Sequence, residues 1–358
     1  MTKKQAFKSI LFCLLFVCML VPLTYMMRTD GVIKDIFTGF YAEPDDTIDV
    51  VMIGSSPVYP CLSGPQMWGE SGFTAYPLAS NVQRPKAAIH LVEEALKTQS
   101  PELFIFEMRM FTYTDEHMME NMAYTRGVTD NMKYSLNRIR TINDLVPDVT
   151  ERYTYYFDII KYHENWKTIV LPDQYRTFLY EKSNSMKGYW LNENVVVGEA
   201  ADVSMITDRL PIPDEQEETL KELLEYLSGH EIQALFLVTP TDLTYDEKKM
   251  CNYMSDYVES YGYHFLDMND YREEIAIDFA TDFYDGGGHT NALGSEKCTA
   301  FLEEYLIETY DLPDKRGQSG YASWDKAYAE WQEKAGQAKR IITEKIETGN
   351  YDGEAGER

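Results

Sequence analysis

The stretch DVVMIGSSPVYP, Asp49–Pro60, decides how the chain is interpreted. Val50 to Ile53 form an unbroken apolar run, which is typical of a strand buried on both faces of a sheet. The run ends in Gly54-Ser55-Ser56. A serine that follows a first buried strand has its hydroxyl at the rim of the sheet, where α/β enzymes place nucleophiles. A serine that caps a short helix would leave the same pattern, so both interpretations stay open here.

Apolar runs of this kind alternate with segments of helical period. The runs cover residues 48–54, 103–108, 232–240 and 263–268, and the helical segments cover residues 85–99, 213–230, 245–262 and 291–310. Because continuous hydrophobicity indicates strands covered on both faces, the order predicts a parallel sheet. The expected fold is a three-layer, doubly wound α/β sandwich of the flavodoxin-like type.

Residues from about 112 to 210 interrupt this alternation. They are rich in Tyr, Asn and charge, and they predict a largely helical insertion with polar loops. An insertion that follows the strand at 103–108 lies near the carboxyl ends of the strands, so we expect it to shape a pocket. His163 and Trp166, in YHENW, share one helical face, and either line a substrate groove or pack on the sheet.

The amino-terminal 28 residues have a different character. Lys3, Lys4 and Lys8 precede 18 uncharged residues, Ile10–Met27, and Arg28 closes the run. That length suits a single membrane-spanning helix. Because bulky residues occupy the place where a signal peptidase needs small ones, we expect an uncleaved signal anchor rather than a cleaved signal peptide. The lysines predict a cytoplasmic amino terminus and an extracellular main domain attached to the cell membrane.

Charge and cysteine content narrow the class of protein further. The chain has a net charge of −26, and the residues after Arg28 carry 29 basic and 59 acidic side chains, a net charge of −30. Such a surface repels nucleic acid, so no nucleic-acid partner is expected. Cys61, Cys251 and Cys298 lie outside the span. Their odd number favours buried free thiols over a disulfide framework, although one bridge stays open.

The carboxyl-terminal part, residues 315–358, follows a main domain that covers residues 29–314. Its sequence predicts a loop followed by a charged helix. In this helix the aromatic residues Trp324, Tyr328 and Trp331 recur at spacings of four and three. We expect this helix to pack its aromatic stripe on the domain rather than to bind a partner. The final residues, 350–358, are expected to be frayed.

A serine nucleophile needs a base, and the base needs an acid to orient it. Of the six histidines, His289 is the best candidate for the base. In TDFYDGGGHTNALG, two acids, Asp282 and Asp285, and three glycines come just before it. Glycines free the backbone to bring an acid and a histidine together. No H-E-x-x-H motif, paired C-x-x-C motif or close histidine pair is present, so neither a metal nor another cofactor is expected.

Two blocks resemble the SGNH/GDSL hydrolase superfamily: VVMIGSSP, and DFYDGGGHTNALGSEKCTAFL some 230 residues later. The resemblance covers roughly residues 48–310. It is closest to the membrane-anchored DltD-like proteins of Gram-positive bacteria, with AlgX-type acetyltransferases as wider kin. It implies that Ser56 is the nucleophile and His289 the base. The family spacing is D-x-x-H, whereas Asp285 stands in D-x-x-x-H, so Asp285 is favoured as orienter with Asp282 as the fallback.

The same resemblance guides the choice of oxyanion and substrate residues. The second family block corresponds to AYPLASNVQRP, which offers Ser80, Asn81 and Gln83 but lacks the family's glycine. The third block, G-x-N-D, is not visible. Ser55, beside the nucleophile, is a further candidate. Because proline has no N–H, Pro57 leaves the amide of Ser56 itself as the local donor.

Three functions follow as hypotheses. The first is an extracytoplasmic serine acyltransferase or esterase that acts through an acyl-serine on a cell-envelope polysaccharide or a teichoic-acid-like polyol polymer. A membrane-bound O-acyltransferase is its candidate partner. The second is a degenerate relative that binds glycan or such a partner without catalysis. The third is a flavodoxin-like sheet that binds phosphate at Gly-Ser-Ser, which the negative charge and the lack of a glycine-rich phosphate loop disfavour.

Overall fold

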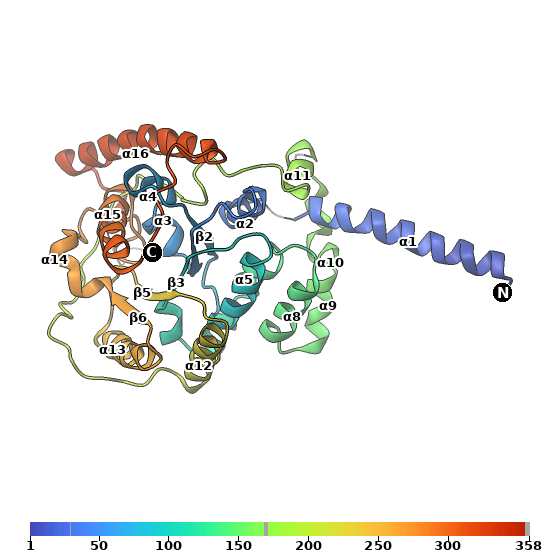
Figure 1. The fold of residues 1–358 in the computed structure, drawn as a ribbon, viewed down its shortest axis with the longest axis horizontal. Coiled ribbons are helices and arrows are strands. Elements are labelled where there is room, and N and C mark those ends of the chain that lie inside the picture. Colours follow the sequence, from blue (N-terminus) through green and yellow to red (C-terminus); the bar gives the residue numbers. More distant parts are fainter. Residues whose placement is uncertain (29, 168–170, 355–358) are drawn as a thin grey trace.

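The computed structural model describes residues 1–28, 30–167 and 171–354. Its core is a five-stranded parallel sheet in the order β2-β1-β3-β5-β6. The strands are β1 (Val50–Gly54), β2 (Ala75–Ala79), β3 (Leu103–Glu107), β5 (Ala234–Val238) and β6 (His264–Asp267) (Figure 1). Every residue of the first four of these strands is buried. The prediction of a parallel α/β sheet is therefore confirmed.

Strand β2 is the one strand of this sheet that the sequence pattern did not predict. It contains Pro77, which lies opposite Met52 of β1. Proline cannot donate a backbone hydrogen bond and argues against a central strand. The strand tolerates it because β2 is at the edge of the sheet and pairs with β1 alone.

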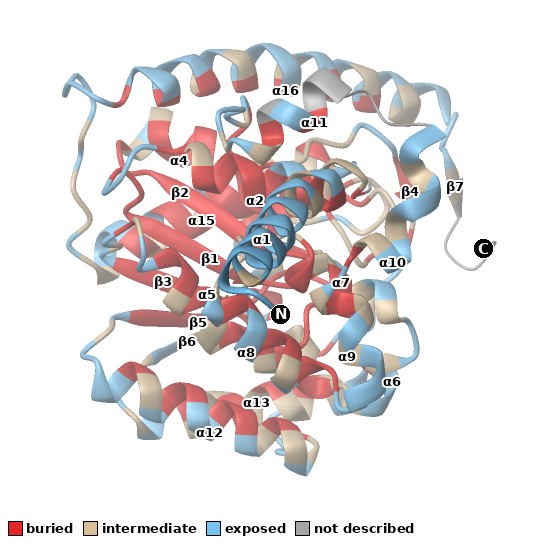
Figure 2. Ribbon diagram, turned by 90° about the vertical axis from the view of Figure 1, so that its right-hand side faces the viewer, coloured by how far each residue is buried: buried red, intermediate tan, exposed pale blue. Residues whose placement is uncertain are grey.

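Helices cover both faces of the sheet, as the three-layer prediction requires (Figures 1 and 2). One face carries α3 (Val58–Cys61), α4 (Gly64–Ser71) and α15 (Ala292–Thr309), and α16 (Ala322–Thr348) lies outside them. The other face carries α5 (Ala88–Ala95), α12 (Asp214–Gly229) and α13 (Tyr245–Ser260).

The strand order reverses at β1, because β2 and β3 lie on its two sides. In such sheets ligands bind beside the carboxyl end of the strand at the reversal.

The remaining elements are short. Those around the sheet are α2 (Val32–Ala42), η1 (Pro85–Ala87), η2 (Arg109–Thr112), η4 (Met268–Tyr271) and α14 (Arg272–Ile275). The insertion comprises α6 (Asp115–Met119), α7 (Met122–Thr129), α8 (Leu136–Leu145), α9 (Val149–Tyr156), α10 (Ile159–Tyr162), η3 (His163–Lys167) and α11 (Leu171–Phe178). Helix α2 packs against the edge strand β2.

The carboxyl-terminal helix α16 packs on the domain, as its aromatic spacing predicts. Trp324 is fully buried and lies 6.3 Å from the ring of Trp68 in α4, and Trp331 is also buried. The expectation of a frayed tail is wrong for residues 350–354. There β7 (Gly353–Glu354) pairs with β4 (Val196–Val197), and Asp352 accepts a hydrogen bond from the amide of Val195 at 2.7 Å. Residues 355–358 lie outside the described residues.

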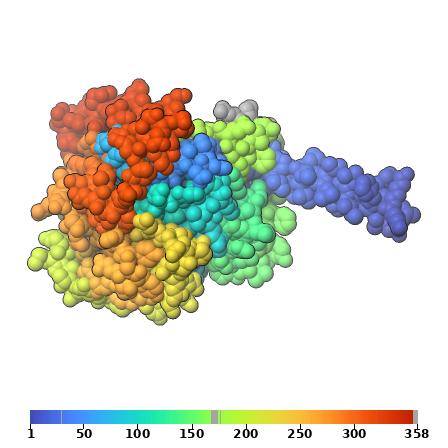
Figure 3. Space-filling model, in the orientation of Figure 1, coloured from blue at the N-terminus to red at the C-terminus, as the bar shows by residue number. Residues whose placement is uncertain are grey.

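Helix α1 (Lys3–Met26) is long and apolar enough to span a membrane, and it projects from the domain (Figures 1 and 3). Its last turn is nevertheless buried in the insertion. The hydroxyl of Tyr25 donates to the carbonyl of Thr177 at 3.2 Å, and Arg28 Nε donates to buried Asp158 at 2.7 Å. The helix is therefore held by side-chain contacts as well as by the chain connection.

The three cysteines of the main domain are buried free thiols, as their odd number favoured. Burial raises the pKa of Cys251 and of Cys298 well above the usual value. Cys61 and Cys298 are close neighbours between α3 and α15. These thiols therefore belong to the packed core of the domain.

Candidate active site

Ser56 lies in the turn between β1 and α3, at the carboxyl end of the strand where the sheet order reverses. No side chain caps α3, and Pro57 precedes its first residue in a helical conformation. The capping interpretation of Ser56 therefore does not hold. Its Oγ lies 2.7 Å from Nε2 of His289, a residue 233 positions later in the chain.

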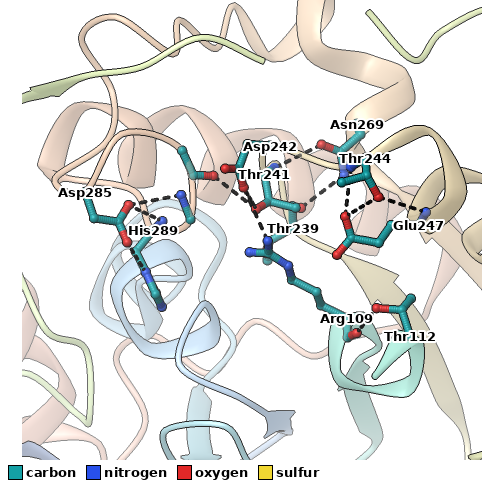
Figure 4. Close-up of polar contacts among 12 residues, drawn as sticks. Arg109, Thr112, Thr239, Thr241, Asp242, Thr244, Glu247, Asn269, Asp285 and His289 are labelled. Carbon is teal, nitrogen blue, oxygen red and sulfur yellow. Dashed lines mark hydrogen bonds and ion pairs between the residues drawn. The ribbon is translucent and has the colours of Figure 1, made fainter. Parts of the chain in front are cut away.

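His289 lies in a tight loop, and the carboxylate of Asp285 folds back to contact the backbone and the histidine ring of the same loop (Figure 4). Asp285 Oδ2 lies 2.5 Å from His289 Nδ1, while Oδ1 accepts hydrogen bonds from the amides of Gly288 at 3.0 Å and His289 at 2.9 Å. Gly286 and Gly287 have φ values of 87° and 143°, which side-chain-bearing residues rarely adopt. The two glycines let the carboxylate fold back onto the histidine across only four residues.

The protonation of this pair follows from its contacts. Burial favours the neutral acid, but hydrogen bonds from the ring and backbone of His289 outweigh it and lower the pKa of Asp285. An ionised carboxylate can only accept hydrogen bonds, so the proton between the two groups belongs to His289 Nδ1. The lone pair on Nε2 is then free to accept the Ser56 hydroxyl proton. The contacts, here called the relay, have the hydrogen-bond order of a serine-histidine-aspartate triad.

Asp282, the fallback orienter, has a different task. Its side chain is fully buried, accepts the amide of Asp278 at 2.8 Å and pairs with Lys297 of α15 at 2.6 Å. Its backbone carbonyl accepts the amide of Asn291, the residue that caps α15. Asp282 therefore fastens the loop to the last helix and makes no hydrogen bond to His289 within the described chain.

A second loop, which the sequence interpretation did not include, supports the histidine loop. It follows β5, and there Thr241 Oγ1 and the amide of Asp242 both donate to the carbonyl of Gly287 at 3.0 Å (Figure 4). Arg109, after β3, reaches Asp242 Oδ1 at 3.3 Å. The signal was available in principle, because the carboxyl ends of parallel strands share one edge of the sheet.

The side chain of Ser55 points into the protein. It is buried and donates to Glu107 Oε2 at 3.2 Å, while Glu107 Oε1 accepts the amide of Arg109 at 2.9 Å. Burial raises the pKa of Glu107 above its usual value. A Cβ at Gly54 would lie 2.5 Å from the Cβ of Glu107, so only glycine lets the two strands approach here.

The loop after β2 separates the three oxyanion candidates. Ser80 and Gln83 are buried, and Ser80 Oγ donates to Gln83 Oε1 at 3.1 Å, so they shape the loop. Asn81 is exposed and lines the same cavity as Ser56. The hydroxyl of Tyr59 donates to Asn81 Oδ1 at 2.7 Å, which orients this amide. The next residue, Val82, has a φ of 45°, a strained conformation for a β-branched side chain.

A cavity of about 960 Å³ opens beside the relay. Ser56 and His289 lie in its wall with the aromatic side chains of Tyr59, Trp190 and Tyr284. The insertion contributes further lining residues, which are Asn121–Tyr124, Arg126, Gly127, Asp130, Asn131, Lys161 and Tyr162. The expectation that the insertion shapes a pocket is confirmed. Arg28 and residues 30–34, the segment that follows α1, complete the wall.

His163 and Trp166 are placed differently from both expectations. They are 63% and 62% exposed, respectively, and neither lines the cavity nor packs on the sheet. Both residues lie in η3, and their side chains are exposed to solvent. Within the described ranges, no group of three or more His, Cys, Asp or Glu side chains is arranged to hold a metal ion.

Comparison with known proteins adds little to this geometry. No protein-family model matches the chain, and no curated protein is similar enough to count as a relative. One similar solved structure is described as "a putative acylhydrolase" from Bacteroides fragilis NCTC 9343. It is 11% identical, with a TM-score of 0.38, and the match covers 79% of this chain and 99% of that one.

Proposed function

We propose that the protein is a membrane-anchored serine enzyme that transfers or hydrolyses acyl esters through an acyl-serine intermediate. The observation that carries the proposal is the continuous relay from Ser56 through His289 to Asp285, at the wall of an open cavity. A nucleophile within hydrogen-bonding distance of a base, with the base held by an acid, is the arrangement that acyl transfer requires.

The chemistry runs in two steps. Ser56 Oγ attacks the carbonyl carbon of an acyl donor, its proton passes to His289 Nε2, and the donor's leaving group takes that proton as it departs. An acceptor hydroxyl then attacks the serine ester. His289 removes the proton of this hydroxyl and returns it to Ser56 as the acylated acceptor leaves. With water as the acceptor, the same sequence is ester hydrolysis.

The negative charge that forms on the carbonyl oxygen needs hydrogen-bond donors. We assign this task to the backbone amide of Ser56 and to the side-chain amide of Asn81, which shares the cavity with the nucleophile. The hydrogen bond from Tyr59 occupies Asn81 Oδ1 and leaves its Nδ2 group as a donor. We do not assign this role to the side chains of Ser55, Ser80 and Gln83, because they form hydrogen bonds inside the protein.

Two features support a donor or acceptor delivered at a membrane outside the cytoplasm. The cavity wall includes Arg28 and residues 30–34, so the reacting groups and the exit of α1 share one cavity. The lysines before the span favour a cytoplasmic amino terminus. The acceptor we propose is a hydroxyl of a cell-envelope glycan or polyol polymer. A membrane-bound O-acyltransferase that supplies the acyl group is the proposed partner.

A catalytically inactive, glycan-binding protein is the second candidate. The incomplete middle blocks of the family pattern favour it. The relay argues against an inactive protein. Asp285 fixes both the ring and the backbone amide of His289, and glycan binding does not require a histidine held in this way.

The test uses the full chain in phospholipid nanodiscs, because the last turn of α1 is buried in the domain. A fluorophosphonate should label Ser56, seen by intact mass and peptide mapping, and p-nitrophenyl acetate should be turned over. Ser56→Ala and His289→Ala should abolish both signals, whereas Ser63→Ala, at the start of α4, should keep them. A folded wild type without label or turnover would favour the binding protein instead.

A further inference from the structure

The outer side of the insertion carries a group of exposed apolar and aromatic residues, here called the anchor-side face. Its members are Val149, Tyr153, Phe157, Ile160, Trp166 and Tyr175, which are exposed by 63%, 57%, 51%, 54%, 62% and 54%, respectively. The first four recur at spacings of four, four and three along α9 and α10. Val149 and Tyr153 lie on one face of α9, Phe157 follows at the end of this helix, and Ile160 lies in α10.

This face lies beside the point at which α1 leaves the domain. Helix α1 contacts α10 and α11 directly. Asn165, next to Trp166, donates to the carbonyl of Met27 at 3.0 Å, and the ring of Tyr25 lies 5.3 Å from Phe178 of α11. Figures 1 and 2 show α9, α10 and α11 at the end of the domain from which α1 projects, and Figure 2 shows exposed residues on α9 and α10.

The length of the span sets how close this face lies to lipid. A helix rises 1.5 Å per residue, so the 18 uncharged residues Ile10–Met27 cover about 27 Å. A bilayer core is about 30 Å thick. The whole uncharged run is needed to cross it, including Tyr25, which is already buried among insertion residues. The insertion must therefore reach the level of the lipid headgroups.

We propose that the anchor-side face sits in the interfacial layer of the bilayer that holds α1, with phospholipid as its occupant. This inference rests on the membrane anchoring in the proposed function. Tyr and Trp are the side chains that favour the membrane–water interface, and apolar residues beside them add buried area. The net charge of −30 beyond the span opposes electrostatic attraction to anionic lipid, so the contact is apolar and aromatic. It holds the cavity at the bilayer surface.

Trp166 is an intrinsic probe for this contact. The protein has five tryptophans, of which Trp68, Trp324 and Trp331 are buried and Trp190 lines the cavity. The full chain is reconstituted into zwitterionic phosphatidylcholine nanodiscs, with or without bromine on the acyl chains near the headgroup. Brominated lipid should quench wild-type emission, and Trp166→Phe should lose that quenching. Equal quenching in wild type and variant would overturn the assignment of Trp166.

A matched pair of variants tests the rest of the face. In the Trp166→Phe background, Tyr153→Trp places a probe on the anchor-side face, and Tyr245→Trp places one at the start of α13, which lies away from α1 in Figure 1. Tyr153 and Tyr245 are 57% and 58% exposed, so the substitutions match in chemistry and exposure. We expect brominated lipid to quench the probe at 153 and not the probe at 245.

The two proposals fail in distinguishable ways. If the chain is extracted from vesicles at alkaline pH, the anchoring itself is wrong. If the chain resists extraction but the probe at 153 is not quenched, the anchoring is correct and the lipid contact is wrong. The anchor-side face would then bind a protein partner instead. Loss of esterase turnover with quenching intact would overturn the enzyme and keep the membrane contact.

Discussion

Asp285 holds His289 at two points: one carboxylate oxygen lies 2.5 Å from the ring nitrogen Nδ1, and the other accepts the backbone amide at 2.9 Å. The ring and the loop that carries it are therefore fixed by a single side chain. This double contact explains why a spacing of four residues works here. Gly286 and Gly287, with left-handed φ values, supply the turn that the longer spacing requires.

Asp285→Asn should keep the fold and lose the chemistry. The amide oxygen can still accept backbone hydrogen bonds, but the amide nitrogen would donate to His289 Nδ1 and place the ring proton on Nε2. Ser56 would then have no acceptor, and we expect kcat to fall by about 10⁴. Ester turnover in nanodiscs measures this. A loss below about tenfold, with a folded variant, would show that Asp285 does not set the tautomer.

The lowered pKa of Asp285 also predicts a pH-dependent contribution to stability. Above the unfolded value of 3.8 the carboxylate is charged in both states and its contribution is fully present. As the pH falls below 3.8, through the lower folded value, the contribution is lost. The difference in unfolding free energy between wild type and Asp285→Asn should therefore be larger at pH 7 than at pH 3. A constant difference in urea titrations would contradict the lowered pKa.

Ser56→Ala should abolish acyl-adduct formation without destabilising the domain. Ser56 caps no helix in this structure, and we expect a change in unfolding free energy within about 0.5 kcal/mol. Ser63 provides the comparison, because its Oγ accepts the amide of Gln66 at 3.3 Å as the cap of α4. Ser63→Ala should cost about 1 kcal/mol and keep activity. Similar destabilisation by both variants would return Ser56 to a structural role.

Asn81→Ala should lower kcat by about 10² to 10³ with little change in KM, because an oxyanion donor acts mainly in the transition state. Tyr59→Phe removes the hydrogen bond that orients Asn81 and keeps the ring. We expect a smaller loss, of about tenfold, from this variant. If kcat is unchanged in Asn81→Ala while KM rises, Asn81 binds substrate and does not stabilise the oxyanion.

The raised pKa of Glu303 predicts that the protein loses stability as the pH rises. Burial, only partly offset by a hydrogen bond from Ser71 at 2.8 Å, raises the pKa of this carboxyl from 4.5 to about 8. Between these values the unfolded chain is ionised while the folded chain keeps its proton, so unfolding becomes easier by at most about 1.4 kcal/mol per pH unit. Glu303→Gln should flatten the decline in Tm between pH 5 and 8, whereas Glu304→Gln, at the exposed next position, should not.

The parts of the fold that were predictable depend on local patterns. Four mostly apolar runs became the central strands and one edge strand, and the amphipathic segments became their covering helices. Strand β2 was missed because Pro77 contradicts a strand locally, and only its place at the sheet edge makes it acceptable. The pairing of β7 with β4 was also missed. The two strands lie more than 150 residues apart in the chain, so no local pattern indicates that they meet.

The sequence by itself determined where a serine and a histidine with acid neighbours could stand, because strand ends and glycine-rich loops have local signatures. Only the tertiary structure decided that Asp285 contacts His289 while Asp282 pairs with Lys297. It likewise decided that Asn81 faces the cavity while Ser80 turns inward. These choices depend on which groups lose water and which partners meet them, and residues from distant strands and helices supply those partners.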